Sequence, residues 1–249
     1  MNSEAEVIAA AARREIIPTS GDGSTIETDL ADLPVLPCGW VVREYSFENH
    51  RIKLTVPAQP DSLLDDPDLR AANDRDDYMP YWAYLWPAAI PMSQAVLNAD
   101  WPEGTRVLEL GCGSGLVGVA ARMKGCRVTL SDYESRSVQL AGHNARINGF
   151  TDVEAVELDW RTPPKRTYPV ILGCDLLYEQ RNLLPILDLL EVMLEPGGCC
   201  WIADGGRNVA HPFWYFARER GYAVTMRDAN GREISTPGFQ YQLFELRRP

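Results

Sequence analysis

Residues 107–118 have the composition and spacing of a cofactor-binding loop: an apolar run, then glycines at 111, 113, 115 and 118 that lead into a second apolar run. The first run predicts a strand over 106–110, and the second predicts a helix over 116–124. In open α/β sheets, ligands bind at the carboxyl ends of the strands, where this loop would lie. Glycines let a ligand approach the backbone closely. The segment therefore predicts a cofactor site.

The glycines allow two interpretations of the cofactor. Residues 113–118 match GxGxxG, and Asp132 stands 19 residues after Gly113, near the spacing of the ribose-binding acid in dinucleotide enzymes. That match supports a nicotinamide-dependent oxidoreductase. If the strand ends at residue 110, however, the turn begins at Gly111, and Glu109 precedes it. A carboxylate there would repel a pyrophosphate but attract the sulfonium and ammonium groups of S-adenosylmethionine, which we expect to be the cofactor.

Hydrolase and metal chemistry are not expected. Ser114 lies between Gly113 and Gly115, so it is not in the GxSxG arrangement of a hydrolase nucleophile. The six cysteines include no CxxC pair, and none of the three histidines lies near a cysteine pair, so no metal is predicted. Several cysteines lie inside apolar runs, where they are expected to behave as small buried hydrophobes in a reducing compartment.

From residue 87 onward, strand-like and helix-like segments alternate with short links, which is typical of a parallel sheet with helices on both faces. Strands are expected over 106–110, 127–131, 153–158, 168–174 and 199–203, and helices over 88–99, 116–124, 134–148, 182–194 and 212–220. Two last strands, 222–227 and 241–247, are separated by a short polar stretch and are expected to pair antiparallel. The predicted fold class is α/β, with a Rossmann-like, seven-stranded, mostly parallel sheet and an antiparallel C-terminal strand.

Residues 1–77 lack this alternation and are expected to form an extension to a domain at 78–249. A short helix is expected over 3–17, an irregular arm over 18–39, and a β-hairpin from the strand-like runs 40–45 and 51–56. Residues 61–77 hold seven acids and two arginines, which predicts a solvated loop or an acidic lip beside a substrate site.

Charge and hydropathy argue against several partners. The formal net charge is −11, so nucleic acid is not expected, whereas an acidic surface would suit a basic protein substrate. The N-terminus has no positive region followed by an apolar stretch, so no signal peptide is expected. No run approaches the ~20 apolar residues that span a bilayer. We expect a soluble cytoplasmic protein without a membrane partner.

Five short motifs resemble one enzyme family. ELGCGSG at 109–115 and SDY at 131–133 resemble two motifs of class I methyltransferases. LDW at 158–160 and DLLY at 175–178 resemble the signatures of the seven-strand protein-lysine methyltransferases, methyltransferase family 16. PYWAYLWP at 80–87 most resembles the branch that contains the electron-transfer flavoprotein β-subunit lysine methyltransferase. The resemblance covers about residues 78–205 and implies an S-adenosylmethionine-dependent enzyme that methylates a protein lysine.

The resemblance also implies which residues hold the cofactor. Asp132 would accept hydrogen bonds from both ribose hydroxyls, and Asp159 would lie near the adenine amine. Glu109 would support the glycine loop, and Trp86 would close over the methionine part. The other implied cofactor-binding residues are Gly111, Cys112, Gly113, Gly115, Tyr133, Trp160 and Cys174. The structural alternatives are a helix N-cap for Asp132 and core packing for the two tryptophans.

The acceptor site is implied at the end of the strand over 168–174. A lysine must be neutral to attack, and Asp175 would accept its proton or orient it. Tyr178, with Trp82 or Tyr84, would offer aromatic faces to the ammonium group. Asp175 and Tyr178 are therefore the catalytic candidates, and Trp82, Tyr84 and Tyr178 the substrate-binding ones. Most of the acceleration is expected from alignment of the reacting atoms.

Three alternatives to protein-lysine methylation stay open. They are a small-molecule N-methyltransferase on the same fold, the nicotinamide-dependent oxidoreductase, and a cofactor-binding protein without catalysis. An exposed aromatic mouth would favour a protein acceptor, and an enclosed pocket would favour a small molecule.

Overall fold

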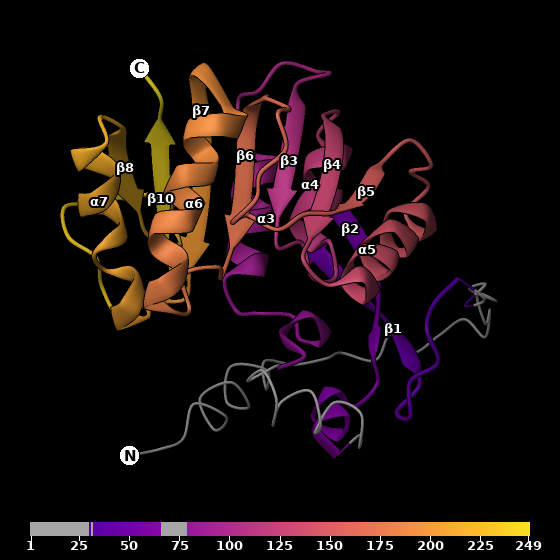
Figure 1. Ribbon diagram of the computed structural model, residues 1–249. Helices are drawn as coiled ribbons and strands as arrows, with labels where there is room; N and C mark the ends of the chain where they lie inside the picture. The colour runs from indigo at the N-terminus through magenta and orange to yellow at the C-terminus, as the bar shows by residue number, and fades with distance from the viewer. Residues whose placement is uncertain (1–29, 31, 66–78) are drawn as a thin grey trace.

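The computed structural model describes residues 30, 32–65 and 79–249. Its centre is a sheet of eight strands in the order β5-β4-β3-β6-β7-β10-β8-β9 (Figure 1). The strands are β3 (Arg106–Leu110), β4 (Arg127–Asp132), β5 (Glu154–Glu157), β6 (Tyr168–Cys174), β7 (Leu194–Asp204), β8 (Ala223–Arg227), β9 (Glu233–Ile234) and β10 (Gln242–Arg247). Strands β3 to β7 pair in parallel, and β10 pairs antiparallel with β7 and β8. The predicted fold class is confirmed; the additional strand, β9, is too short to show a sequence period.

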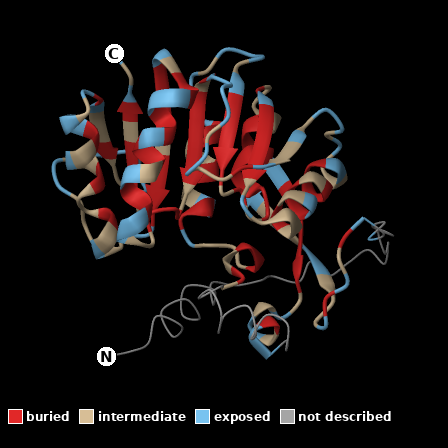
Figure 2. Cartoon of the chain, in the orientation of Figure 1, coloured by how far each residue is buried: buried red, intermediate tan, exposed pale blue. Residues whose placement is uncertain are grey.

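Helices cover both faces of this sheet, because successive residues of a strand point to opposite sides. They are α3 (Ala89–Leu97), α4 (Leu116–Met123), α5 (Ser135–Ile147), α6 (Gln180–Met193) and α7 (Phe213–Glu219). Val107 and Val170 share a core with α3, α4 and α5. Leu108 and Ile171 share the opposite core with α6 and α7. Figure 2 shows the resulting layer of buried strands between more exposed helices.

The expected start of one strand was wrong. A strand was expected over 199–203, but α6 ends at Met193 and β7 already begins at Leu194. Tyr168 pairs with Leu194, and the register then shifts before Val170 pairs with Cys199. The proline and glycines at 196–198 therefore lie at a bulge inside the strand, a common place for both residue types.

The predicted hairpin is confirmed and packs on the sheet domain. It consists of β1 (Trp40–Phe47) and β2 (His50–Pro57), which pair antiparallel. Ile52, Leu54 and Val56 of β2 are buried in the same core as α4 and α5. Three short 3-10 helices complete the described elements: η1 (Pro60–Asp65), η2 (Tyr81–Ala83) and η3 (Asn208–Ala210). The helix expected over 3–17 and residues 66–77 of the acidic segment lie outside the described residues.

Among the described residues, no helix is long and apolar enough to cross a membrane. In the same parts of the chain, no group of three or more His, Cys, Asp or Glu side chains is placed to hold a metal ion.

Candidate active site

The glycine loop lies at the carboxyl end of β3, with α4 directly after it. Gly111, Gly113 and Gly115 have φ angles of 58°, 53° and 80°, in the left-handed region that favours glycine. The turn is closed by the Gly115 N–H, which donates to the Cys112 carbonyl at 2.7 Å. A Cβ on Gly111 would overlap Leu176 Cδ2, so glycine lets this loop lie against the residues that follow β6. The turn thus begins at Gly111, as the S-adenosylmethionine interpretation required.

Asp132 ends β4, the strand next to β3, and its carboxylate faces the glycine loop. Oδ2 accepts from the Gly113 N–H at 3.0 Å and from the Ser137 hydroxyl at 2.7 Å, while Oδ1 accepts from the Glu134 N–H at 3.0 Å. Three of about four acceptor positions of the carboxylate are occupied, which leaves room for one further donor on Oδ1. The N-cap of α5 is Glu134, so Asp132 itself is not the helix N-cap.

Glu109 is buried beneath the loop and is held by a backbone donor. Its Oε2 accepts from the Gly118 N–H of α4 at 2.8 Å. Burial raises the pKa of Glu109 to about 8, despite this hydrogen bond. Burial also raises the pKa of Asp132, which lies nearby. Glu109 and Asp132 are thus two buried carboxylates that resist ionisation. A cationic ligand bound beside them would stabilise their ionised forms, so the site favours a cation.

This raised pKa predicts a pH dependence of cofactor affinity. In the free protein Glu109 is protonated below about pH 8, and a bound sulfonium favours its ionised form, so binding releases a proton there. We expect the dissociation constant of S-adenosylmethionine to fall between pH 6.5 and pH 8, by up to about tenfold per pH unit. Titration calorimetry across this range measures it.

Glu109→Gln is the matched control for this prediction. The amide oxygen of glutamine can still accept from the Gly118 N–H, but the side chain no longer titrates. The cofactor's own amino group also titrates near pH 8, identically in both proteins. The variant should therefore lose part of the pH dependence. Identical pH profiles for the two proteins would show that Glu109 does not sense the cofactor charge.

Gly118 gives a stability prediction because it lies where α4 crosses β4. Glycine to alanine usually stabilises a helix by about 1 kcal/mol. A Cβ on Gly118, however, would overlap Leu130 Cδ2 and Glu109 Oε2. Gly118→Ala should therefore destabilise the protein by about 1–3 kcal/mol. Gly142 of α5 is the control, since a Cβ there would lie 3.5 Å from Ala155 Cβ, and Gly142→Ala should stabilise by up to about 1 kcal/mol. Urea unfolding measures the stability of both variants. Equal unfolding midpoints for Gly118→Ala and Gly142→Ala would contradict the predicted overlap at residue 118.

Cys112 and Cys174 flank this region, and they are buried and partly buried, respectively. Cys112 Sγ lies 3.9 Å from Ser137 Oγ, and Cys174 Sγ lies 3.7 Å from Asp175 Oδ2. Burial raises the pKa of both thiols. Neither is therefore an activated nucleophile, because the reactive form of cysteine is the thiolate.

The residues expected at the adenine end come together beside β4 and β5. Arg161 donates from Nε and Nη2 to the carboxylate of Asp159 at 2.8–3.0 Å, and this partner lowers the pKa of Asp159. The same guanidinium lies over the exposed ring of Tyr133, 5.4 Å from its centroid. Trp160 packs against the core that contains α6 and lies near Gly111. Asp159 is thus already engaged by Arg161, a partner that the sequence pattern did not indicate.

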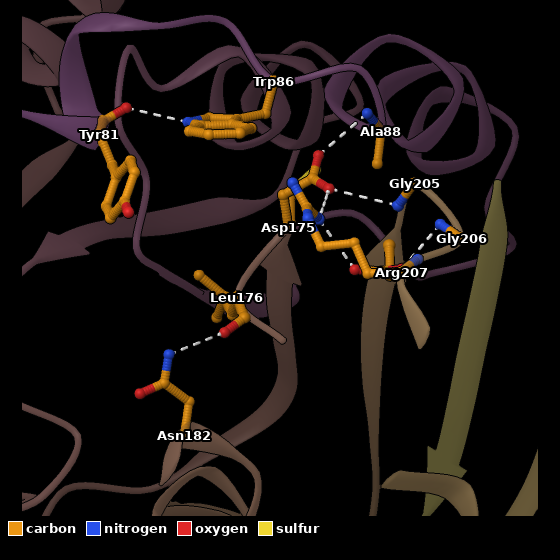
Figure 3. A network of polar contacts seen from close by, with 11 residues as sticks. Tyr81, Trp86, Ala88, Asp175, Leu176, Asn182, Gly205, Gly206 and Arg207 are labelled. Carbon is orange, nitrogen blue, oxygen red and sulfur yellow. Dashed lines mark hydrogen bonds and ion pairs between the residues drawn. The ribbon is translucent and has the colours of Figure 1, made fainter. Parts of the chain in front are cut away.

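Asp175 directly follows β6 and is the centre of a buried polar network (Figure 3). Its Oδ2 accepts from the Ala88 N–H at 3.0 Å, and its Oδ1 accepts from the Gly205 N–H at 3.2 Å. Arg207 forms an ion pair with Asp175 and a second one with Asp204 at 2.9 Å. Only 1% of the Asp175 side chain is exposed. The expected direct contact with a lysine therefore does not fit this arrangement, since both oxygens are occupied inside the protein.

Four aromatic side chains lie next to the polar network around Asp175, and one of them, Trp86, contacts Arg207. The Trp86 indole donates to the Tyr81 carbonyl at 2.9 Å, and the Arg207 guanidinium lies 5.3 Å from the Trp86 ring centroid. Ring centroids of Tyr81 and Tyr178 are 5.1 Å apart, and those of Tyr84 and Trp86 are 6.1 Å apart. These four side chains form an aromatic mouth. It contains Trp86, Tyr84 and Tyr178, which were expected at the site, together with Tyr81.

Trp82 is not part of this mouth. It is buried in a separate hydrophobic cluster with Leu63 and Leu140, and its ring centroid lies 6.5 Å from that of Trp40. Neighbours in the short helix η2 point in different directions, so consecutive aromatic residues cannot all face the site. The expected substrate-binding role of Trp82 is replaced by core packing. The Tyr84 hydroxyl, in contrast, donates to Asp61 Oδ1 at 2.8 Å, which places one residue of the acidic segment beside the mouth.

Sequence reasoning missed Arg207 and Asp204, although a signal was available. The segment DGGR at 204–207 begins at the carboxyl end of β7, the parallel strand next to β6. Polar residues that follow adjacent parallel strands meet at one edge of a sheet. An open depression of about 440 Å³ lies at this edge. It is lined by Tyr178, Gly206, Arg207, Asn208, Val209 and Phe239.

Methyltransferases are among the known proteins that this chain resembles in sequence. The electron transfer flavoprotein beta subunit lysine methyltransferase of Rattus norvegicus is 26% identical over 171 residues, 63% of this chain and 65% of that protein. A protein N-lysine methyltransferase of Danio rerio is 32% identical over 162 residues, 59% of this chain and 63% of that protein. A histone-arginine methyltransferase of Rattus norvegicus is 28% identical over 126 residues, 47% of this chain and 56% of that protein. The matched region spans less than two thirds of each of these relatives.

Solved structures share the fold. A TehB-like S-adenosylmethionine-dependent methyltransferase from Corynebacterium glutamicum has a TM-score of 0.55 and 15% identity, covering 77% of this chain and 100% of that one. A ribosomal protein L11 methylase from Lactobacillus delbrueckii has a TM-score of 0.53 and 17% identity, covering 71% and 92%. The family model described as "Lysine methyltransferase" matches residues 63–214, which is more than half of the sequence. The chain therefore belongs to the lysine methyltransferase family.

Proposed function

We propose that this protein transfers a methyl group from S-adenosylmethionine to a lysine side chain of a protein. The choice of cofactor rests on one observation: two backbone N–H groups near the glycine loop donate to carboxylates. Asp132 accepts from the Gly113 N–H, and Glu109 accepts from the Gly118 N–H. In dinucleotide enzymes the pyrophosphate binds at the N–H groups of such a helix N-terminus. Here buried acids hold these donors, an arrangement that disfavours a phosphate and suits a cation.

The residues present fit S-adenosylmethionine at each part of the site. The glycine loop and Glu109 would hold the amino-acid end, and Asp132 would accept one ribose hydroxyl through its open position on Oδ1. Trp160 and Tyr133 would pack on adenine near Asp159, and Trp86 would cover the methionine part. When bound, the cofactor supplies a methyl group activated by the sulfonium.

The acceptor side supports a lysine for reasons of charge and shape. Asp175 and Asp204 contribute two buried carboxylates against one guanidinium, so the network carries a net negative charge that attracts an ammonium group. Tyr178 and Trp86 offer aromatic faces that stabilise a cation before and after methylation. Asp175 acts as a positioning residue in this proposal, because its carboxylate holds Arg207, Ala88 and Gly205 in place without touching the lysine.

A protein acceptor is favoured over a small molecule by the openness of the site. The depression beside Tyr178 opens to the surface, and Phe239 on its rim is 77% exposed. Two relatives are named as lysine methyltransferases, whereas another is named for arginine. We also propose a cytoplasmic location, since all six cysteines are unpaired, as expected in a reducing compartment.

Thermal unfolding with S-adenosylmethionine, S-adenosylhomocysteine and NAD, measured side by side, tests the choice of cofactor. A ligand at ~100-fold above its dissociation constant adds ~2.7 kcal/mol of stability. We expect the first two ligands to raise the melting temperature and NAD to leave it unchanged. Stabilisation by NAD alone would contradict the proposal and favour the GxGxxG interpretation.

A further inference from the structure

Helix α5 presents a row of polar side chains to the interior of the protein. Ser137 and Asn144, which are seven residues apart, lie on one face, and Asn148 lies one turn further along. Ser137 and Asn144 are fully buried. A buried amide is costly unless its donors and acceptor are satisfied, so the partners of Asn144 show what this position does.

Asn144 bonds to both the hairpin and the glycine loop. Its Oδ1 accepts from the Thr55 N–H at 2.7 Å, and its Nδ2 donates to the Thr55 carbonyl at 3.0 Å. These two bonds pair with the backbone of β2 as a neighbouring strand would, and among the described strands only β1 pairs with β2. Nδ2 also donates to the Ser114 carbonyl at 2.8 Å, inside the glycine loop. One side chain thus connects a segment near residue 55 with the turn that is proposed to hold the cofactor.

Asn148 provides a natural comparison. It accepts from the Lys53 N–H at 3.0 Å and donates to the Lys53 carbonyl at 2.7 Å, so it pairs with β2 in the same way. Its remaining bond goes to the Asn144 carbonyl of its own helix at 2.7 Å. The two asparagines therefore hold the hairpin alike, and only Asn144 reaches the glycine loop.

The Asn144 bond is one of three side-chain hydrogen bonds to the backbone of Gly113 and Ser114 in this loop. The Gly113 N–H donates to Asp132, and the Gly113 carbonyl accepts from the Ser137 hydroxyl at 3.0 Å. The Ser114 carbonyl accepts from Asn144. Carbonyl orientation in a turn depends on such partners, because the loop's left-handed backbone has no regular hydrogen-bond pattern of its own.

We propose that Asn144 is a positioning residue that couples the N-terminal hairpin to the cofactor loop. The proposal rests on the proposed function, since it assumes that this loop binds S-adenosylmethionine and its product. An ordered hairpin holds Asn144 in the rotamer that orients the Ser114 carbonyl. A bound cofactor orders the glycine loop and so stabilises the same bond between Asn144 and Ser114. Coupling of this kind is reciprocal, so cofactor binding should stabilise the Asn144–Thr55 contact as much as that contact supports cofactor binding.

The first test measures S-adenosylhomocysteine binding by calorimetry in three proteins. Asn144→Asp keeps an acceptor for the Thr55 N–H but donates nothing to Thr55 or Ser114. Asn148→Asp makes the same change at Lys53 without affecting the loop. We expect the dissociation constant to rise at least about tenfold, or about 1.4 kcal/mol, for Asn144→Asp and to stay within about twofold for Asn148→Asp. Equal affinities in all three proteins would overturn the coupling and leave the cofactor assignment standing.

A second measurement uses the unaltered protein and needs no folded variant. Amide exchange of Thr55 and Lys53 is followed by NMR with and without S-adenosylhomocysteine. Both amides bond to asparagine side chains, so Lys53 is the internal reference for any general stabilisation. Stronger slowing at Thr55 than at Lys53 supports the coupling, and equal slowing contradicts it. Failure of the unaltered protein to bind S-adenosylhomocysteine would overturn the proposed function as well.

Discussion

Asp132→Ala should raise the dissociation constant of S-adenosylmethionine by about 100-fold or more. The variant removes the charged acceptor proposed for the ribose, and a hydrogen bond to a charged group contributes about 1.5–3 kcal/mol, or roughly 10- to 150-fold. It also leaves the Gly113 N–H without its acceptor, and it removes one of the two acceptors, Asp132 Oδ2 and the Gly113 carbonyl, that lie near the Ser137 hydroxyl. The loop then loses a partner as well as the ligand contact, so the two effects add. Calorimetry with S-adenosylmethionine measures the change.

Asp152→Ala is the matched control for this prediction. Like Asp132, Asp152 is an aspartate that accepts hydrogen bonds. Its side chain is exposed, however, and it pairs with Arg122 at 3.1 Å, remote from the glycine loop. Surface ion pairs contribute little, so neither stability nor cofactor affinity should change measurably. If Asp132→Ala bound the cofactor as tightly as Asp152→Ala, the site would have to be placed elsewhere.

Asp175→Asn should reduce turnover by about 100-fold while cofactor affinity stays nearly unchanged. Asp175 has a φ of 57°, and asparagine tolerates this left-handed conformation, so the backbone is expected to persist. One carboxylate oxygen becomes an amide donor, which opposes either the Ala88 N–H or the donors from Gly205 and Arg207. Displacement of Arg207 by even ~1 Å would misalign the acceptor, at a cost of the order of 100-fold.

The control for this change is Asp188→Asn, which alters an exposed aspartate paired with Arg220. Methyl transfer should then proceed at the normal rate. Steady-state kinetics separates the effects: Asp175→Asn should lower kcat, and S-adenosylhomocysteine should still bind. Intact turnover in Asp175→Asn would refute the role assigned to this network. Loss of both turnover and cofactor binding would show that Asp175 also supports the cofactor site.

The sequence was informative where one local segment carries both the element and the functional group. Strand β3, the glycine loop and helix α4 form one continuous pattern, and Asp132 and Asp175 each follow a strand closely. Parallel strands bring their carboxyl ends to one edge, so these residues were predicted to meet. The same rule applied to β7 would have indicated Asp204 and Arg207.

Side-chain pairing between distant segments was not predictable. Nothing in the segment around Trp82 distinguishes it from Trp86, yet one packs in the interior beside Trp40 and the other lies against Arg207. Asn144 lies inside the expected helix over 134–148, and its link to Thr55 spans 89 positions. Such contacts depend on the final packing of elements, which residue spacing along one element does not determine.

Transfer of labelled methyl groups tests the central proposal most directly. The purified protein is incubated with protein extract and S-adenosylmethionine that carries a labelled methyl group, and the labelled protein is hydrolysed to amino acids. We predict label in methylated lysine, at a level that falls strongly with Asp175→Asn and is unchanged with Asp188→Asn. Label in methylated arginine or histidine, label confined to small molecules, or no transfer despite tight cofactor binding would contradict the proposal of a protein-lysine methyltransferase.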